Sequence, residues 1–172
     1  MLTRQEQWLK WSLYAAAVAV LTLLEMLVLG NARVLGVYFV LPPLFVGVVA
    51  SMEGMRAGMI FGMVYGALCD LTVAGTFPCV HTVAFVLAAM LCGAIARSVL
   101  QPGVICSVAV TLLTFGVLDA LNMLSLRVSD HAPLLPMLSI ALRETLISCP
   151  LLLAVHPVLM WLHKRFAIYT SL

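Results

Sequence analysis

Six long apolar stretches follow one another along the 172-residue chain, separated by short polar or helix-breaking segments. A helix needs about 20 mostly apolar residues to cross the hydrocarbon core of a bilayer. The pattern therefore predicts an all-α, polytopic membrane helix bundle with about six transmembrane helices, in a single integral membrane domain. The predicted spans are residues 8–30, 34–52, 55–74, 80–100, 102–126 and 138–162.

Prolines make two of these spans irregular. Pro42 and Pro43 interrupt the second apolar run, so this run is either a full span or a short or broken helix. Pro150 and Pro157 are expected to kink the last helix. The first run is longer than the roughly 7–15 residues of a signal-peptide core and contains Glu25, so we interpret it as a retained span.

The composition fits a membrane protein and excludes other classes. Hydrophobic residues make up 64% of the chain and charged residues 9%, and the mean hydropathy is +1.16. A soluble domain has roughly 25% charged residues, so an ordinary cytosolic domain, a coiled coil and a disordered chain are excluded. The net charge of +2 also argues against nucleic-acid binding. The five cysteines are expected to be packing residues, and a Cys69–Cys79 disulfide is the alternative for those two.

The basic residues predict how the chain is oriented. If the N-terminus is cytoplasmic, the inner side carries more lysine and arginine than the outer side, as the positive-inside rule requires. The inner residues are Arg4, Lys10, Arg56, Arg97, Lys164 and Arg165, and the outer residues are Arg33 and Arg127. We therefore expect a multi-pass protein with both termini in the cytoplasm.

A row of glycines in the third span is the most specific pattern. Gly54, Gly58, Gly62 and Gly66 recur every four residues. Such overlapping G-x-x-x-G motifs let two helix backbones approach closely, which drives packing inside lipid. The row predicts helix packing within the bundle, and docking of a partner's helix is the alternative. Gly75 and Pro78 follow and predict a tight outer turn.

Polar residues inside the spans predict an intramembrane cluster. Ionisable groups within a membrane are costly and tend to mark interhelical contacts or functional sites. With the predicted orientation, these residues all lie in the outer half of the bilayer. We expect Arg143 at the centre of this cluster, with Asp70 or Asp119 as its partner. The cluster either forms polar contacts that hold the helices together or is a ligand or partner site open to the outside. Its predicted members are Glu25, Asp70, Asp119, Asn122, Arg143 and Glu144.

Common catalytic motifs are not found in the sequence. The chain contains no H-E-x-x-H, no G-x-S-x-G and no Walker A sequence, and its four histidines do not share an i, i+4 spacing. We therefore predict no catalytic residue, no metal site and no cofactor, and expect a non-enzymatic role.

The order of these features resembles the bacterial rod-shape-determining protein MreD family. The shared features are a short basic N-terminus, a second span entered through Pro42-Pro43, the glycine row closing in "GMVYGALCDLTVAG", an acid within the fifth span in "FGVLDALN", and a short basic tail. The resemblance covers nearly the whole chain, and its specific part is Gly54 to Gly75. The chain departs from the family at Pro78, where the family often has glycine.

The resemblance implies a role in bacterial cell elongation. It implies a subunit of the plasma (inner) membrane that maintains cell shape through helix-mediated association with MreC, a bitopic protein. Further implied partners are the lateral-wall glycosyltransferase and transpeptidase, and MreB filaments, directly or through other subunits. The family is also similar in fold to the S-components of energy-coupling-factor vitamin transporters, which hold a small ligand. A small-molecule-binding S-component is therefore the second functional hypothesis.

Overall fold

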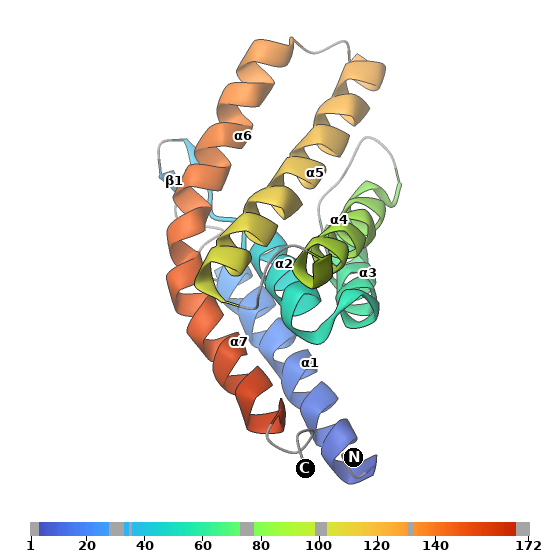
Figure 1. Cartoon of the computed structure of the whole chain (residues 1–172). Coiled ribbons are helices and arrows are strands. Elements are labelled where there is room, and N and C mark those ends of the chain that lie inside the picture. Colours follow the sequence, from blue (N-terminus) through green and yellow to red (C-terminus); the bar gives the residue numbers. More distant parts are fainter. Residues whose placement is uncertain are drawn as a thin grey trace.

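The computed structural model describes residues 4–27, 33–34, 36–72, 78–98, 103–130 and 133–167, and in this part it is an all-α membrane helix bundle, as predicted (Figure 1). Antiparallel strands β1 and β2 form a small hairpin in which Arg33 pairs with Tyr38 and Val34 with Val37. The elements in chain order are α1 (Arg4–Leu27), β1 (Arg33–Val34), β2 (Val37–Tyr38), α2 (Pro42–Glu53), α3 (Met55–Thr72), α4 (Val80–Ser98), α5 (Val104–Asp130), α6 (Leu134–Ser148), the 3₁₀ turn η2 (Cys149–Leu151) and α7 (Leu152–Ala167).

Within the described residues, four segments are long enough and apolar enough to cross a membrane. They are Gln7–Glu25, Val80–Arg97, Val104–Ser129 and Leu134–Arg165. The last of these runs from α6 through η2 into α7, so the irregularity predicted at Pro150 takes the form of a 3₁₀ turn. Large apolar side chains such as Ile105 and Leu135, each at least 80% exposed, cover the outside of the bundle. Lipid rather than water is the medium that accepts such a surface.

The second predicted span is wrong in its first part. Helix α2 begins only at Pro42, and the preceding residues form the β1–β2 hairpin and an extended segment. Proline fixes φ and lacks an N–H, so it is tolerated in the first turn of a helix but not in its interior. The 12 residues of α2 rise about 18 Å, whereas the hydrocarbon core is about 30 Å thick. The alternative of a short helix is therefore the correct one.

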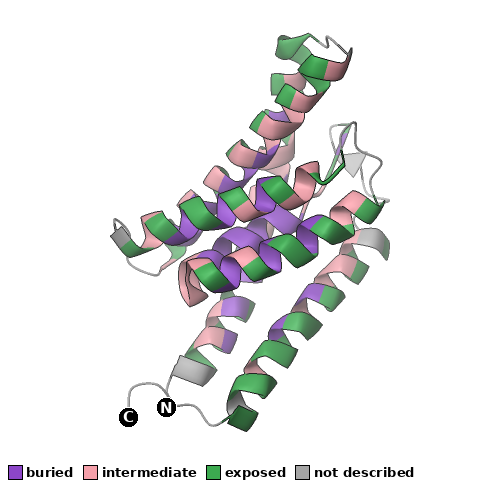
Figure 2. Cartoon of the chain, turned by 90° about the vertical axis from the view of Figure 1, so that its right-hand side faces the viewer, coloured by how far each residue is buried: buried purple, intermediate pink, exposed green. Residues whose placement is uncertain are grey.

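Helix α2 forms the centre of the bundle. Every residue from Leu41 to Ala50 is buried, and α2 packs against α3, α4, α5 and α7 (Figure 2). A helix that is apolar on all sides is stable only when other elements surround it. The long helices therefore enclose a short one that does not reach across the bilayer.

The chain enters and leaves the bundle at the same end. Figure 1 shows the start of α1 and the end of α7 together at the bottom, and the end of α5 with the start of α6 at the top. Lys10 and His163, which come from these two terminal helices, both contact Glu53 at the end of α2. The two ends of the described chain therefore lie at one end of the bundle, and the placement of both termini in the cytoplasm stays a prediction.

Candidate functional site

The glycine row is built into the contact of α3 with its neighbours α2 and α4. A Cβ added to Gly58 would collide with Ala50 of α2. A Cβ on Gly62 would lie 2.9 Å from the carbonyl oxygen of Phe85 in α4, and one on Gly66 would lie 2.8 Å from the backbone nitrogen of Thr82. The backbones of α3 and α4 thus leave no room for a side chain. This face of α3 is covered inside the bundle and is not open to a partner in this structure.

Gly54 has a different role from the rest of the row. Its φ of +92° is a backbone conformation that other residues rarely adopt. The guanidinium of Arg97 lies 2.8 Å from the position that a Cβ would take. Gly54 therefore forms the corner between α2 and α3. Gly93 of α4, which the sequence did not single out, extends the α3–α4 contact, because a Cβ there would lie 2.8 Å from that of Met55.

Glu25 supports the start of the buried helix α2. Its Oε1 accepts a hydrogen bond of 3.3 Å from the backbone N–H of Leu41, the residue that caps α2. The preceding residue, Val40, donates its N–H to the Ser148 hydroxyl at 3.1 Å. Helices α1 and α6 thus supply hydrogen-bond acceptors for the backbone N–H groups of the extended segment that leads into α2. Glu25 therefore has a local structural role at this segment.

Asp70 joins the end of α3 to the first turn of α4. Its Oδ1 accepts the backbone N–H of His81 at 3.0 Å and lies 2.9 Å from Nδ1 of the same residue. Its Oδ2 accepts the N–H of Thr82 at 3.0 Å and the Thr82 hydroxyl at 2.6 Å. A carboxylate is favourable here, because the first N–H groups of a helix lack internal partners and carry partial positive charge.

The turn between α3 and α4 is described only in part. Gly75 lies outside the described residues, and Pro78 lies in an exposed turn just before α4. Cys79, the next residue, has a φ of +64°. The thiols of Cys69 and Cys79 are both free, so the alternative of a disulfide between them is wrong.

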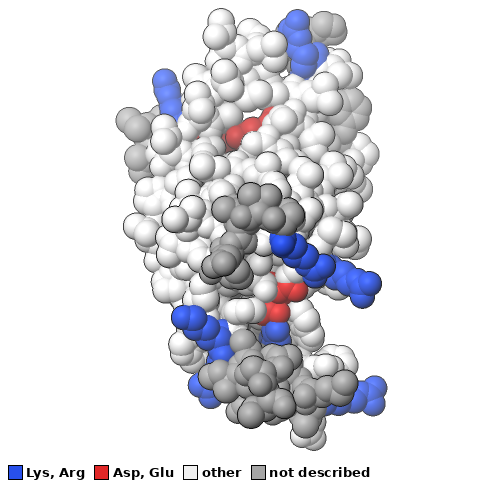
Figure 3. Space-filling view, in the orientation of Figure 1, with Lys and Arg blue, Asp and Glu red and all other residues white. Residues whose placement is uncertain are grey.

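The remaining predicted polar residues meet between α5 and α6. Asp119 and Asn122 of α5 face Glu144 of α6 across a cavity of about 180 Å³. Neither carboxyl forms a hydrogen bond or an ion pair with any described residue. Figure 3 shows an acidic patch in a hollow between these helices, with no lysine or arginine atoms beside it on this face. The other lining residues are Met123, Leu126, Met137, Ile140 and Ala141.

Arg143 does not neutralise this pair. It precedes Glu144 directly on α6, and successive residues of an α-helix point about 100° apart. Arg143 is exposed on the surface and forms no ion pair with a described residue. The predicted single cluster centred on Arg143 is therefore wrong. The acids divide among three places: the start of α2, the start of α4 and the α5–α6 groove, by which we mean the cavity lined by Asp119, Asn122 and Glu144.

The α5–α6 groove lies deep in the membrane-spanning region. Asp119 is ten residues before the end of its span at Ser129, and Glu144 is ten residues after the start of its span at Leu134. Ten helical residues rise about 15 Å, which is half of a hydrocarbon core about 30 Å thick. The two unpaired carboxyls therefore face each other about 15 Å, measured along the helix, from the neighbouring ends of their candidate spans.

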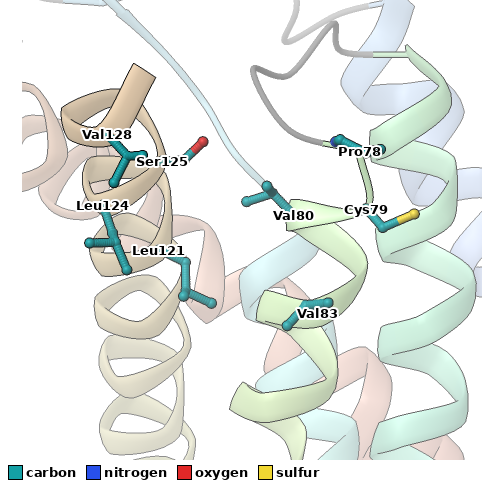
Figure 4. Close-up of a pocket in the computed structure, with 8 residues that line it drawn as sticks. All are labelled: Pro78, Cys79, Val80, Val83, Leu121, Leu124, Ser125 and Val128. Atoms are coloured by element: carbon teal, nitrogen blue, oxygen red, sulfur yellow. The ribbon is translucent and has the colours of Figure 1, made fainter. Parts of the chain in front are cut away.

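A second cavity flanks the same half of α5 on the side of α4. It measures about 330 Å³ and is almost wholly apolar, with Ser125 and Cys79 as its polar members. Figure 4 shows Val80 and Val83 of α4 pointing toward α5, and Leu121 and Ser125 pointing back toward α4. The first half of α5 is packed instead, with Val110, Thr114 and Phe115 buried. The second half of α5 therefore has open space on both sides.

A polar network at the end of α2 was not anticipated from the sequence. The Glu53 carboxylate pairs with Lys10, accepts the Tyr14 hydroxyl at 2.8 Å and lies 2.8 Å from Nδ1 of His163. Glu53 is at the α2–α3 corner, outside the four long spans. Burial by itself raises the pKa of Glu53, but the hydrogen bonds from His163, Lys10 and Tyr14 outweigh it and lower the pKa to about 2. The network ties α1 and α7 to α2.

A buried serine–histidine pair links α5 to α7. The Ser107 hydroxyl lies 2.8 Å from Nδ1 of His156, and their residues are 1% and 9% exposed. Neither residue lines the cavities described above, so the pair has no visible access for a substrate. We interpret it as an interhelical hydrogen bond. This pair was not predictable from the sequence, because the two residues are 49 positions apart.

Comparisons with protein-family models, with curated proteins and with solved structures found no match.

Proposed function

We propose that this protein is a non-enzymatic membrane subunit of the bacterial cell-elongation complex, similar to MreD. In this proposal it lies in the plasma (inner) membrane with both termini in the cytoplasm. It maintains cell shape by binding MreC and, through that contact, the glycosyltransferase and transpeptidase of lateral wall synthesis and the MreB filaments. The sequence resemblance supports the family, and the α5–α6 groove supports the mechanism of association.

The α5–α6 groove is the observation that carries this proposal. It offers unpaired polar groups within two candidate membrane spans, in otherwise apolar surroundings. Without water, polar groups in a bilayer are satisfied by other polar groups, and such contacts hold transmembrane helices together. A second helix lying along α5 and α6 would supply them. The protein would then work as a scaffold that binds a partner sideways within the membrane.

The glycine row takes no part in the proposed docking of a partner helix. Gly58, Gly62 and Gly66 are buried against α2 and α4, so the row builds the scaffold and does not serve as its docking strip. A partner surface must be sought on faces that remain open, and the α5–α6 groove is such a face.

The groove does not favour the alternative of a vitamin-binding S-component. Its volume of about 180 Å³ is below the roughly 300–1,000 Å³ of pockets that enclose drug-sized ligands. The larger cavity beside α4 is almost wholly apolar, whereas recognition of a vitamin requires several well-placed polar groups.

Co-purification from native membranes tests the proposed function. The tagged protein, extracted in a mild detergent, is expected to retain MreC and the wall-building transpeptidase, and cells without it are expected to lose their rod shape. Mass spectrometry of small molecules released from the same sample checks the alternative. Rod-shaped cells without the protein, together with a stoichiometric vitamin-like ligand, would overturn the proposal.

A further inference from the structure

We infer that the α5–α6 groove binds a transmembrane helix that carries a basic side chain within its membrane-spanning segment. The inference rests on the proposed function, since it specifies the chemistry of the partner. Asp119 and Glu144 would accept hydrogen bonds from the basic group, one from each wall of the groove. Arginine is the better fit than lysine, because its planar guanidinium can bond to two carboxylates at once.

Charge complementarity selects the basic group. Two carboxyls that face each other in a medium of low dielectric constant cannot both stay ionised without a counter-charge. No described residue supplies that charge, since Arg143 is exposed and lies outside the groove lining. The Asn122 amide adds a neutral hydrogen-bonding group at the same place. A cation from another molecule would satisfy all three groups together.

The rest of the lining indicates that a helix delivers this cation. Met123, Leu126, Met137 and Ile140 are apolar, and methionine adapts its shape to irregular helix surfaces. The second half of α5 has open space on both flanks, so α5 can adjust as a helix seats against it. The groove therefore combines a polar centre with the apolar margins that a transmembrane helix requires.

The depth of the groove argues against a lipid headgroup as the source of the cation. Asp119 and Glu144 each lie about 15 Å along the helix from the end of their span. A lipid amine at the membrane surface does not reach this depth without leaving the interface. A side chain carried on a spanning helix is placed there by the helix itself.

A model peptide provides a direct test. The full-length protein is placed in lipid nanodiscs with a labelled polyleucine helix that carries one central arginine, and binding is measured by energy transfer. The same helix with glutamine in place of arginine is the comparison. We expect the arginine peptide to bind at least about tenfold more tightly. In the Asp119→Asn/Glu144→Gln double variant, the two peptides are expected to bind equally.

Arg143→Gln is the matched control, because Arg143 is on the same helix but outside the groove. This variant is expected to keep the full preference for arginine, and the helical content of each variant is measured to show that it folds. Equal binding of both peptides to the native protein would overturn the inference, and so would a preference that survives in the double variant.

The peptide result and the proposed function can fail separately. If the double variant still co-purifies with the wall-elongation proteins from native membranes, the groove is not their docking site and the inference fails while the function stands. If the native protein retains none of them but prefers the arginine peptide, the inference stands and the proposed function fails.

Discussion

Two regions of this bundle differ in whether their carboxyl groups have partners within the chain. In the region of α2, α3 and α4, the carboxylates of Glu25, Glu53 and Asp70 all have partners within the chain. In the region of α5 and α6, Asp119 and Glu144 have none among the described residues. The packing differs in the same sense, because α3 and α4 meet backbone to backbone whereas the second half of α5 is flanked by cavities.

The difference separates groups that maintain the fold from groups available for binding. A carboxylate that accepts the first N–H groups of a helix offsets its desolvation and holds two elements together. A carboxylate without a partner adds only a cost to folding, so its presence requires another explanation. The first region is therefore the structural frame, and the second is the candidate binding surface.

Gly62→Leu gives the largest expected effect, because it separates α3 from α4. The added side chain meets the backbone of Phe85, which cannot rotate away, so we expect the free energy of unfolding to fall by about 3 kcal/mol. Gly116→Leu on α5 is the matched control, because a Cβ there meets nothing within 4 Å. Unfolding in detergent micelles measures both. Equal losses would mean that the glycine contact is not special.

Glu53→Gln tests the network at the corner of α2 and α3. The substitution removes the charge that pairs with Lys10 and His163, and we expect a loss of about 2 kcal/mol in unfolding free energy. Lys164→Gln, an exposed change beside His163, is the control and should have no effect. A variant as stable as the native protein would show that Glu53 does not tie the terminal helices to α2.

The same network predicts how stability depends on pH. The pKa of Glu53 falls from 4.5 to about 2 on folding, so its contribution is fully present above about pH 4.5 and is lost as the pH falls through about 2. The native protein should therefore be more stable than Glu53→Gln above about pH 4.5, and the two should converge as the pH falls from about 4.5 to about 2. A difference that vanishes near neutral pH would contradict the assigned contacts.

Paired aspartate variants test the comparison most directly. Asp70→Asn loses a charge that accepts hydrogen bonds from two residues of α4, and we expect it to cost about 1–2 kcal/mol. Asp119→Asn keeps the shape of the side chain and removes a carboxyl that has no partner among the described residues, so stability should stay the same or rise. Thermal unfolding of both variants under the same conditions measures which substitution lowers the stability more. The opposite ranking would make Asp119 part of the structural frame.

Ser107→Ala gives the smallest expected effect. It removes one interhelical hydrogen bond to His156, and such bonds in membrane proteins contribute about 0.6 kcal/mol. Ser139→Ala is the control, because its hydroxyl bonds within its own helix to Pro136 and is exposed. If Ser107→Ala lowers the unfolding free energy several times more than this, the Ser107–His156 pair contributes more to the α5–α7 contact than a single hydrogen bond.

Features that depend on neighbouring residues were predictable from the sequence. The apolar runs predicted the helical bundle, and the prolines at 42 and 43 indicated a short or broken helix as an alternative to a full second span. The four-residue spacing of the glycines predicted close packing of α3, because spacing fixes which residues share a helix face. It did not predict that α4 is the main neighbour, since that depends on how the helices associate.

The partners of the polar residues were not predictable in the same way. Glu53 looked like a break between spans, yet it collects Lys10, Tyr14 and His163 from helices far apart in the sequence. Arg143 looked like the natural partner of the acids, yet the helix turns it away from Glu144. Opposite charge shows that a pair is favourable, but only the rotation and contact of helices decide whether it forms.

The sequence by itself therefore determined that the protein lies in a lipid membrane, that it is helical, and where helix backbones approach closely. These follow from local composition and from periodicity, which act through the hydration of side chains and the geometry of one helix. The tertiary structure alone decided that α2 is a buried core and that the four acids predicted to form one cluster divide into three groups. It also decided that one of these groups remains unpaired, because pairing across helices depends on distances that no single helix contains.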